Sequence, residues 1–321
     1  MKVAVTGANS FLGSWICREL CASHEVLGIV RPNSNIHRLS DLENIRLFRS
    51  ESKFLKDIFL QERPQILILN DWWGVGNKPR NHPKQYENVS RVVDIVQFAL
   101  AAGVEVVVGV GSQAELGPQS QTILESTLGR PTTTYGNAKA LLKQALEEML
   151  TPTETRFVWA RIFSTYGPLD DGKWLIPTLI DSLLNSQEYE MTFGEQEWSY
   201  LHAYDLGKAF GIVVNNRDIN GLVHIGNPST ITIRDLAEMI GDKTGKKHLI
   251  KFGAVQYRVD QVMLLKPLCE TLSDFGWQPL IDLSDGVDQT IRWLKGSTNT
   301  NLTLNNGSIL NSNLPSRTLP C

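Results

Sequence analysis

Lys2-Val3-Ala4-Val5-Thr6-Gly7-Ala8-Asn9-Ser10-Phe11-Leu12-Gly13 is the stretch of this chain that decides its fold. The first five residues predict a short apolar strand, and the spacing of apolar residues over 11–22 predicts a helix. The turn between them is built of small residues, and it leads into a helix terminus whose N–H groups can bind a phosphate. A doubly wound sheet binds the pyrophosphate of a dinucleotide at this point. We therefore predict a dinucleotide site here, against the alternative of an ordinary tight turn.

Strand and helix patterns alternate along the first half of the chain. They predict strands at 2–6, 25–30, 44–48, 64–69, 104–110 and 156–162, and helices at 11–22, 88–102 and 134–150. This alternation predicts an α/β fold, a Rossmann-type doubly wound parallel sheet with helices on both faces. The dinucleotide-binding domain is expected to span residues 1–165, with a returning segment at about 203–226.

The second half of the chain is less regular. Its pattern predicts helices at 173–185, 205–214, 233–244 and 285–295, strands at 198–202 and 222–225, and a helix stop at Gly296. We interpret residues 166–296 mainly as a smaller α/β substrate-binding region. Residues 297–321 are rich in Asn, Ser, Thr and Leu with almost no charge, so we expect them to lack fixed structure.

Composition excludes several kinds of partner. The chain has 321 residues and a net charge of -3, which provides no basic surface for nucleic acid. Its apolar runs are too short to cross a bilayer, and no secretory signal is visible, so we expect a cytoplasmic protein without a membrane partner. Cys17 and Cys21 lie at helical spacing, but no second Cys/His pair follows at ligand spacing. We expect buried thiols rather than a metal site.

Two Tyr/Lys pairs at a spacing of four residues are present, Tyr135/Lys139 and Tyr204/Lys208. Residues four apart share one face of a helix, so the phenol and the ammonium of each pair are adjacent. A nearby positive charge favours the phenolate and lowers the phenol pKa, which would provide a proton donor and acceptor near neutral pH. The spacing alone occurs often by chance, and at most one pair can be an active site.

The end of the second predicted strand selects between NAD and NADP. An acidic residue there would bind the adenine-ribose hydroxyls of NAD. This chain has Val30-Arg31-Pro32-Asn33-Ser34 instead. Arg31 can bind a 2′-phosphate, and Asn33 and Ser34 can add hydrogen bonds. We favour NADP(H), with NAD(H) possible and a solvated surface arginine as the alternative.

Together these residues resemble the extended short-chain dehydrogenase/reductase family, which includes nucleotide-sugar epimerases, dehydratases and reductases. The family pattern is Gly-x-x-Gly-x-x-Gly; Gly7 and Gly13 match it, and Ser10 replaces the middle glycine. The resemblance places the active-site serine at Ser112, five residues before Gly117, and selects Tyr135 and Lys139 on the next helix. No serine loop precedes Tyr204/Lys208, which resembles a structural segment of the family, and His202 beside it is interpreted as structural.

The resemblance extends over about residues 1–295. Asn88 matches the family asparagine at the start of the fourth helix, and the segments 160–168 and 275–279 also match. It implies a set of cofactor contacts, which are Gly7, Asn9, Ser10, Phe11, Leu12, Gly13, Arg31, Asn33, Ser34, Asn70, Asn88, Tyr135, Lys139 and Ile162. The family often dimerises through the helices at 88–102 and 134–150, so a homodimer is expected from the resemblance alone.

The reaction type depends on the residues after Ser112. The 4,6-dehydratases of the family carry Asp-Glu there, whereas this chain has Gln113 and Ala114, which cannot transfer a proton, and Glu115 is one position too late. The epimerases usually carry the acidic residue at the second strand, which is absent here. Segments 71–75, 111–115 and 196–201 look most like reductases of nucleotide-linked 4-keto-6-deoxysugars, such as CDP-paratose/abequose synthase-like enzymes. An epimerase is the alternative.

The hypothesis is therefore that NADPH reduces a keto group on a nucleotide-linked sugar. Tyr135 would donate the proton, Ser112 would hydrogen-bond the oxygen, and Lys139 would lower the Tyr135 pKa and hold the nicotinamide ribose. Trp72 and Trp73 would either stack on the substrate or pack, and Arg258 would pair with a diphosphate or a surface acid. The expected substrate contacts are Trp72, Trp73, Ser112, Gln113, Trp174, Ile176 and Arg258. A relative that binds NADP without turnover, as a sensor, is an alternative of another class.

Overall fold

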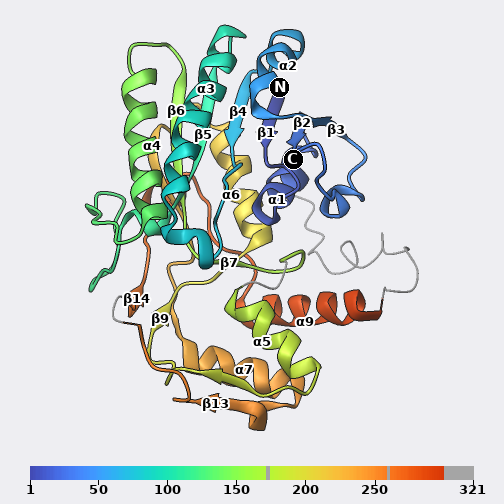
Figure 1. The fold of residues 1–321 in the computed structure, drawn as a ribbon, viewed down its shortest axis with the longest axis vertical. Coiled ribbons are helices and arrows are strands. Elements are labelled where there is room, and N and C mark those ends of the chain that lie inside the picture. Colours follow the sequence, from blue (N-terminus) through green and yellow to red (C-terminus); the bar gives the residue numbers. More distant parts are fainter. Residues whose placement is uncertain (171–173, 259–260, 300–321) are drawn as a thin grey trace.

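The computed structural model describes residues 1–170, 174–258 and 261–299. A large sheet with helices on both faces forms the upper part of the molecule in Figure 1, and a smaller layer of helices and short strands lies below it. The predicted disorder of residues 300–321 falls outside the described residues. Within the described residues, no helix is long and apolar enough to span a bilayer.

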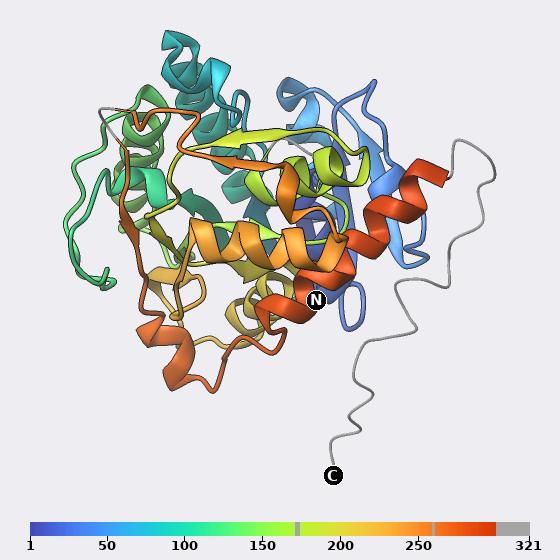
Figure 2. The same cartoon turned by 90° about the horizontal axis from the view of Figure 1, so that it is seen from below.

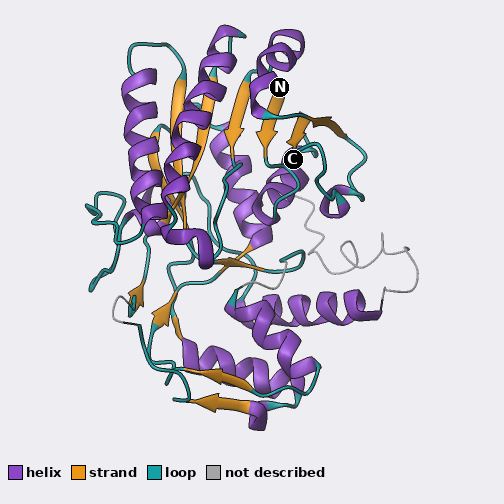
Figure 3. Cartoon of the chain, in the orientation of Figure 1, coloured by secondary structure: helices purple, strands orange, loops and turns teal. Residues whose placement is uncertain are grey.

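The central sheet has seven strands, all paired in parallel, in the order β11-β6-β5-β4-β1-β2-β3. The strands are β1 (Lys2–Thr6), β2 (Glu25–Val30), β3 (Ile45–Arg49), β4 (Ile66–Leu69), β5 (Val106–Ser112), β6 (Arg156–Ile162) and β11 (Gly221–Ile225). This is the strand order of a doubly wound dinucleotide-binding sheet, so the predicted fold class is confirmed. The parallel strands end toward the lower layer, as the arrows of Figure 3 show.

Helices cover both faces of the sheet, because its strands are apolar on both sides. One face carries α2 (Leu55–Glu62), α3 (Glu87–Ala101) and α4 (Thr134–Leu150), which contact one another in sequence. The other face carries α1 (Phe11–Leu20) and α6 (Ala203–Asn215), which pack closely together. The chain therefore leaves the sheet after β6 and returns to it with α6 and β11.

The lower layer is built mainly from α5 (Leu175–Leu184), α7 (Ile233–Thr244) and α9 (Leu283–Asn299), which contact one another. Figure 2 shows α7 and α9 from below, across the base of the molecule. Three small groups of short strands complete the lower layer and connect it to the central sheet. They are β7 (Thr165–Tyr166) with β10 (Leu201–His202), β8 (Tyr189–Met191) with β13 (Ile250–Phe252), and β9 (Glu197–Trp198) with β12 (Ile231–Thr232) and β14 (Leu264–Leu265); α8 (Glu270–Asp274) follows β14.

Several predicted element ends are shifted by one or two residues, and two boundaries differ more substantially from the sequence prediction. The strand predicted at 198–202 is two strands, because β9 pairs with β12 and β14 whereas β10 pairs with β7. The last helix does not stop at Gly296 but continues to Asn299, so the tail predicted from residue 297 begins as helix. A glycine in a helix costs only about 1 kcal/mol relative to alanine, which is too little to end the helix by itself.

Candidate active site

The turn after β1, where the phosphate site is predicted, depends on two glycines. Gly7 has a φ of 64°, and a Cβ at Gly13 would lie 2.3 Å from the Gly7 carbonyl oxygen, so both positions require glycine. Ser10, which replaces the family's middle glycine, caps α1 by accepting a hydrogen bond from the Gly13 N–H at 3.1 Å. The Asn70 amide donates to the Ser10 hydroxyl at 2.8 Å and to the Gly7 carbonyl at 3.1 Å. Asn70, which directly follows β4, therefore holds the predicted phosphate turn in place.

The segment after β2 holds Arg31, Asn33 and Ser34 in an exposed loop at the carboxyl edge of the sheet. Arg49 at the end of β3 donates to the carbonyl oxygens of Pro32 and Ser34, both at 2.9 Å, and thereby fixes this loop. The neighbouring Asn9 amide donates to the Asn35 carbonyl at 3.0 Å, which joins the loop to the phosphate turn. No local sequence pattern indicates these contacts of Arg49, because its acceptors lie 15 and 17 residues earlier in the chain.

Ser112 ends β5 and caps the following turn, Gln113–Glu115. Its hydroxyl accepts from the Ala114 N–H at 3.2 Å, and its own N–H donates to the Glu115 carboxylate at 2.6 Å. Glu115 is buried and also accepts from Arg161 Nε at 3.2 Å and Trp159 Nε1 at 3.0 Å. Its carboxylate is therefore committed to holding the Ser112 loop, which agrees with its exclusion as an elimination acid or base.

Tyr135 and Lys139 lie on the first two turns of α4, with only 7% and 4% of their surfaces exposed. Thr133 caps the helix by accepting from the Gly136 N–H at 3.1 Å. A Cβ at Gly136 would lie 2.2 Å from the Ala114 carbonyl oxygen, so glycine lets α4 approach the Ser112 loop. As a result the side chains of Tyr135 and Ser112 are hydrogen-bonded.

The electrostatics of this pair differ from the sequence prediction. Burial raises the pKa of Tyr135; the hydrogen bond to Ser112 opposes this, Glu115 adds to it, and Arg80 opposes it. Lys139 is not among the described groups that act on Tyr135. Its ammonium donates to the Val110 carbonyl at 2.7 Å, and desolvation lowers its own pKa to about 7. The predicted lowering of the Tyr135 pKa by Lys139 is therefore wrong for this arrangement.

Trp72 and Trp73 follow β4 and have different surroundings. The indole N–H of Trp72 donates to Gln85 Oε1 at 2.7 Å, and the Lys139 ammonium lies 3.9 Å from the centre of its ring. Trp72 also contacts the Tyr135 ring edge-on, with centroids 6.0 Å apart. These contacts favour packing over sugar stacking for Trp72.

Trp73 is held through its backbone instead. Its N–H donates to the Asn88 side chain at 2.9 Å, and the Asn88 amide donates back to its carbonyl at 3.2 Å. Asn88 thus fixes the loop after β4, which is a structural role the sequence analysis did not assign to it. Ile162, at the carboxyl end of β6, is buried.

The second Tyr/Lys pair has a different environment. Lys208 on α6 forms an ion pair with Glu19 of α1 at 2.7 Å, and this contact joins the two helices. His202 caps α6 by accepting from the Tyr204 N–H at 3.2 Å and is buried. These contacts are structural, as the sequence analysis expected for both.

The remaining predicted substrate residues do not converge on one cluster. Gln113 is half-buried beside Ser112, while Trp174 and Arg258 are exposed in the lower layer. Ile176 is 1% exposed within the core of α5, α7 and α9, which argues against the pocket contact predicted for it. The substrate contacts of Gln113, Trp174 and Arg258 stay predictions.

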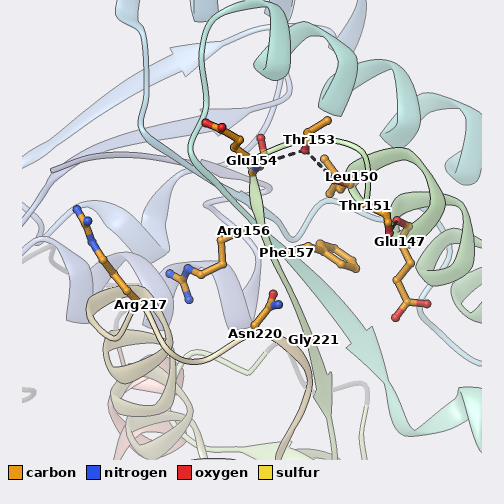
Figure 4. Close-up of a pocket in the computed structure, with 11 residues that line it drawn as sticks. Glu147, Leu150, Thr151, Thr153, Glu154, Arg156, Phe157, Arg217, Asn220 and Gly221 are labelled. Carbon is orange, nitrogen blue, oxygen red and sulfur yellow. Dashed lines mark hydrogen bonds between the residues drawn. The ribbon is translucent and has the colours of Figure 1, made fainter.

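A cavity of about 570 Å³ opens at the opposite end of the sheet, where β6 begins. Figure 4 shows Arg156 and Arg217 beside it, with Thr153, Glu154 and Asn220. Arg156 Nη1 donates to the carbonyl oxygens of Val213, Asn216 and Ile219, so its guanidinium caps the end of α6. This cavity lies at the start of β6, whereas Ser112 lies at the end of β5, so the cavity is separate from the site formed by Ser112, Tyr135 and Lys139.

A doubly wound parallel sheet with a glycine turn after its first strand is the architecture of dinucleotide-binding proteins. The family model described as "NAD dependent epimerase/dehydratase family" matches residues 3–226. The chain belongs to this family.

Individual relatives are distant. The dTDP-4-dehydro-6-deoxyglucose reductase of Escherichia coli is 24% identical over 170 residues, which cover 51% of this chain and 53% of that protein. The chain thus spans about half the length of this reductase. An uncharacterised UDP-glucose epimerase of Bacillus subtilis strain 168 is 24% identical over 78% of this chain and 85% of its own length. The CDP-abequose synthase of Salmonella typhimurium strain LT2 is 25% identical over 43% of this chain and 48% of its own.

Solved structures agree on the fold. The UDP-glucose 4-epimerase of Thermotoga maritima, solved with UDP-glucose, has a TM-score of 0.86 at 18% identity and covers 93% of this chain and 100% of its own. The Thermus thermophilus UDP-glucose 4-epimerase, solved with NAD, has a TM-score of 0.84 at 18% identity and covers 92% and 100%.

Proposed function

We propose that this protein reduces a keto group on a nucleotide-linked 6-deoxysugar, with NADPH as the reductant and Tyr135 as the proton donor. The observation that carries the proposal is the buried Tyr135 phenol, hydrogen-bonded to Ser112 at the carboxyl edge of the sheet. Burial raises its pKa, so the phenol keeps its proton at neutral pH and can donate it. The commitment of Glu115 to Ser112 and Arg161 leaves no described acid–base pair for elimination in the Ser112 loop.

The residues present fit a dinucleotide. Gly7 and Gly13 permit the tight turn that leads into α1, because a Cβ at Gly13 would collide with the Gly7 carbonyl oxygen, and the capped start of α1 offers N–H groups to the pyrophosphate. When bound, the cofactor supplies a hydride to the keto carbon. Tyr135 gives its proton to the ketone oxygen, Ser112 hydrogen-bonds that oxygen, and Lys139 holds the nicotinamide ribose.

Residues 1–165, with the returning segment at about 203–226, are proposed to bind the cofactor, and the rest of residues 166–296 mainly to bind the nucleotide sugar. Arg31, Asn33 and Ser34 support NADP because the end of β2 carries no acid and the Arg31 loop is fixed by Arg49. A homodimer through α3 and α4 is part of the same proposal and is supported only by the family resemblance.

The test is NADPH oxidation with a panel of nucleotide-linked 4-keto-6-deoxysugars. Tyr135→Phe is expected to lower kcat by roughly 10²- to 10⁴-fold, because it removes the general acid. Tyr204→Phe is the matched control, since it changes the other Tyr/Lys pair, and it should retain turnover. Full turnover by Tyr135→Phe would refute the mechanism.

Cofactor binding distinguishes the alternatives. NADP is expected to raise Tm more than NAD at equal concentration, and Arg31→Ala should remove the difference. NAD that co-purifies, together with interconversion of two sugars without net NADPH loss, would favour the epimerase suggested by the Bacillus subtilis relative. NADP binding without turnover of any nucleotide sugar would favour the sensor.

A further inference from the structure

The segment between β4 and α3 folds over the start of α4. It contains two short 3₁₀ turns, Lys78–Asn81 and Pro83–Tyr86. Within the first turn, the Arg80 guanidinium carbon lies 5.6 Å from the centre of the Tyr135 ring. Neither the Tyr/Lys spacing nor the serine loop indicates this contact, because Arg80 is 55 residues before Tyr135 in a segment without periodicity.

Both ends of the Arg80 turn are anchored. The next residue, Asn81, accepts from the Thr134 N–H through its side chain and from the Thr134 hydroxyl through its carbonyl, both at 3.2 Å. On the other side, the buried Gln85 amide donates to the carbonyl oxygens of Pro79 at 3.0 Å and Gly74 at 2.7 Å. Pro79 is thus fixed to Gln85, and Asn81 is fixed to Thr134, the neighbour of Tyr135.

Few charges face the Tyr135 ring, and their signs differ. Glu115 opposes the phenolate, although its carboxylate is paired with Arg161 at 3.2 Å. The Lys139 ammonium is directed to the Val110 carbonyl and the Trp72 ring. Farther out, Asp71 and Arg91 form an ion pair whose charges act on Lys139. Among the described residues, Arg80 is the cation that acts on Tyr135.

We propose that Arg80 is a positioning residue that stabilises the phenolate of Tyr135, a role that the Tyr/Lys pair does not fill in this arrangement. A guanidinium keeps its charge at every pH at which the protein is folded, whereas a buried ammonium does not. The phenolate forms whenever Tyr135 gives up its proton, so Arg80 acts in the same way in reduction and in the reverse oxidation. The inference rests on the proposed function only in taking Tyr135 as the group that transfers the proton.

The test follows the titration of Tyr135 itself. The full chain is produced with 3,5-difluorotyrosine, whose phenols titrate at lower pH than tyrosine, and is observed by ¹⁹F NMR. The signal of position 135 is assigned by its loss in Tyr135→Phe. Arg80→Gln should raise the pKa at position 135 by about one pH unit, because a neighbouring cation is removed. Arg80→Lys should restore most of the original value.

Lys84→Gln is the matched control. It removes a cation from the same segment, but Lys84 lies over Trp73, with its ammonium 5.2 Å from the ring centre, and not over Tyr135. This variant should leave the Tyr135 titration within a few tenths of a pH unit of the parent. Arg80→Met, which keeps the length of the side chain without its charge, replaces Arg80→Gln if that variant does not fold.

Turnover gives a second readout. The pH limb of kcat that belongs to Tyr135 should move upward in Arg80→Gln in parallel with the NMR titration. The inference is overturned if Arg80→Gln raises only KM with the titration unchanged, because Arg80 then binds substrate. It is equally overturned if Lys84→Gln shifts the titration as much. A shifted titration in a protein that reduces no nucleotide sugar would support Arg80 and refute the proposed function, so the two failures are distinguishable.

Discussion

Glu115 is a buried carboxylate that joins the Ser112 turn to the neighbouring strand β6. It accepts from the Ser112 N–H, from Trp159 and from Arg161, so three hydrogen bonds orient it. Glu115 lies one residue after the position that the Asp-Glu pair takes in the dehydratases, and this difference changes what its carboxylate contacts. At that position the carboxylate closes the capping box of the Ser112 turn instead of facing the site.

Glu115→Gln tests this role. The amide can still accept from the Ser112 N–H, but it leaves the buried Arg161 guanidinium without its ionic partner. We expect a loss of about 3 kcal/mol in the free energy of unfolding, measured by urea denaturation. Glu147→Gln is the control, because it breaks the more exposed ion pair with Lys143 and should cost less than about 1 kcal/mol. Equal losses in the two variants would contradict the assignment.

The residues that could be predicted from the sequence are those whose neighbours are close in the chain. The spacing of four predicts that Tyr135 and Lys139 share a helix face, and the family resemblance selects this pair together with Ser112 at the end of the preceding strand. Arg80 and Gln85 could not be predicted, because their contacts depend on an irregular segment that folds back onto α4. For the same reason the effect of Lys139 on the Tyr135 pKa was predicted wrongly, because a spacing of four does not show which acceptor the lysine side chain reaches.

At the scale of elements, the contact between α4 and the Ser112 turn decides whether the site forms. The two approach closely only because residue 136 has no side chain, since an added Cβ would lie 2.2 Å from the Ala114 carbonyl oxygen. The backbone of α4 or of the turn would have to move to admit a methyl group. Either movement would separate Tyr135 from Ser112.

Gly136→Ala is therefore expected to destabilise the protein by about 1–3 kcal/mol through overpacking, and to lower kcat by roughly tenfold or more. Gly296→Ala is the matched control in another helix, because nothing lies within 4 Å of its added Cβ. That control should stabilise the protein by about 0.5–1 kcal/mol. Thermal unfolding and turnover of both variants check the prediction, and a fully active Gly136→Ala would show that the close contact is not needed.

Element boundaries were predictable where the local sequence pattern alone determines them. The strands β1, β2 and β6 and the helices α4 and α7 begin and end as predicted. The helix α2 was not predicted, because it spans only eight residues. The division of the 198–202 strand depends on partners that are distant in the sequence, β7 and β14, and no local pattern contains them.

At the scale of the whole molecule, two buried histidines lie near the connections between the sheet and the lower part. The His202 ring contacts Trp15 of α1 and Tyr166 of β7 edge-on, with centroids 6.0 Å and 5.5 Å apart. His224 on β11 hydrogen-bonds the Leu268 carbonyl at 2.9 Å and Arg161 at 3.3 Å. With its Nδ1–H donating to Leu268 and its Nε2 accepting from Arg161, neutral His224 satisfies both partners, whereas a second proton would face the guanidinium.

These surroundings predict a specific loss of stability in acid. Burial lowers the pKa of His202 to about 4, and burial together with Arg161 lowers that of His224 to about 4, from 6.5 in the unfolded chain. At these two positions the unfolded state therefore binds more protons below pH 6.5, and the stability that the neutral histidines contribute is lost as the pH falls toward 4. Asp205, whose pKa burial raises to about 6, acts in the opposite direction and offsets part of this loss. Each histidine contributes a loss on the order of 3 kcal/mol over this range.

Urea unfolding between pH 7.5 and 4.5 measures this dependence, with His202→Asn and His224→Asn as the variants. An asparagine oxygen can replace the His202 Nδ1 as the cap of α6, and an asparagine amide can replace the His224 donor to Leu268. Each variant should therefore lose less stability than the parent as the pH falls, whatever its stability at pH 7.5. His82→Gln, at an exposed position, should keep the acid dependence of the parent. A parent protein whose free energy of unfolding is constant from pH 6.5 to 4.5, or a His82→Gln variant that reduces the loss equally, would refute the prediction.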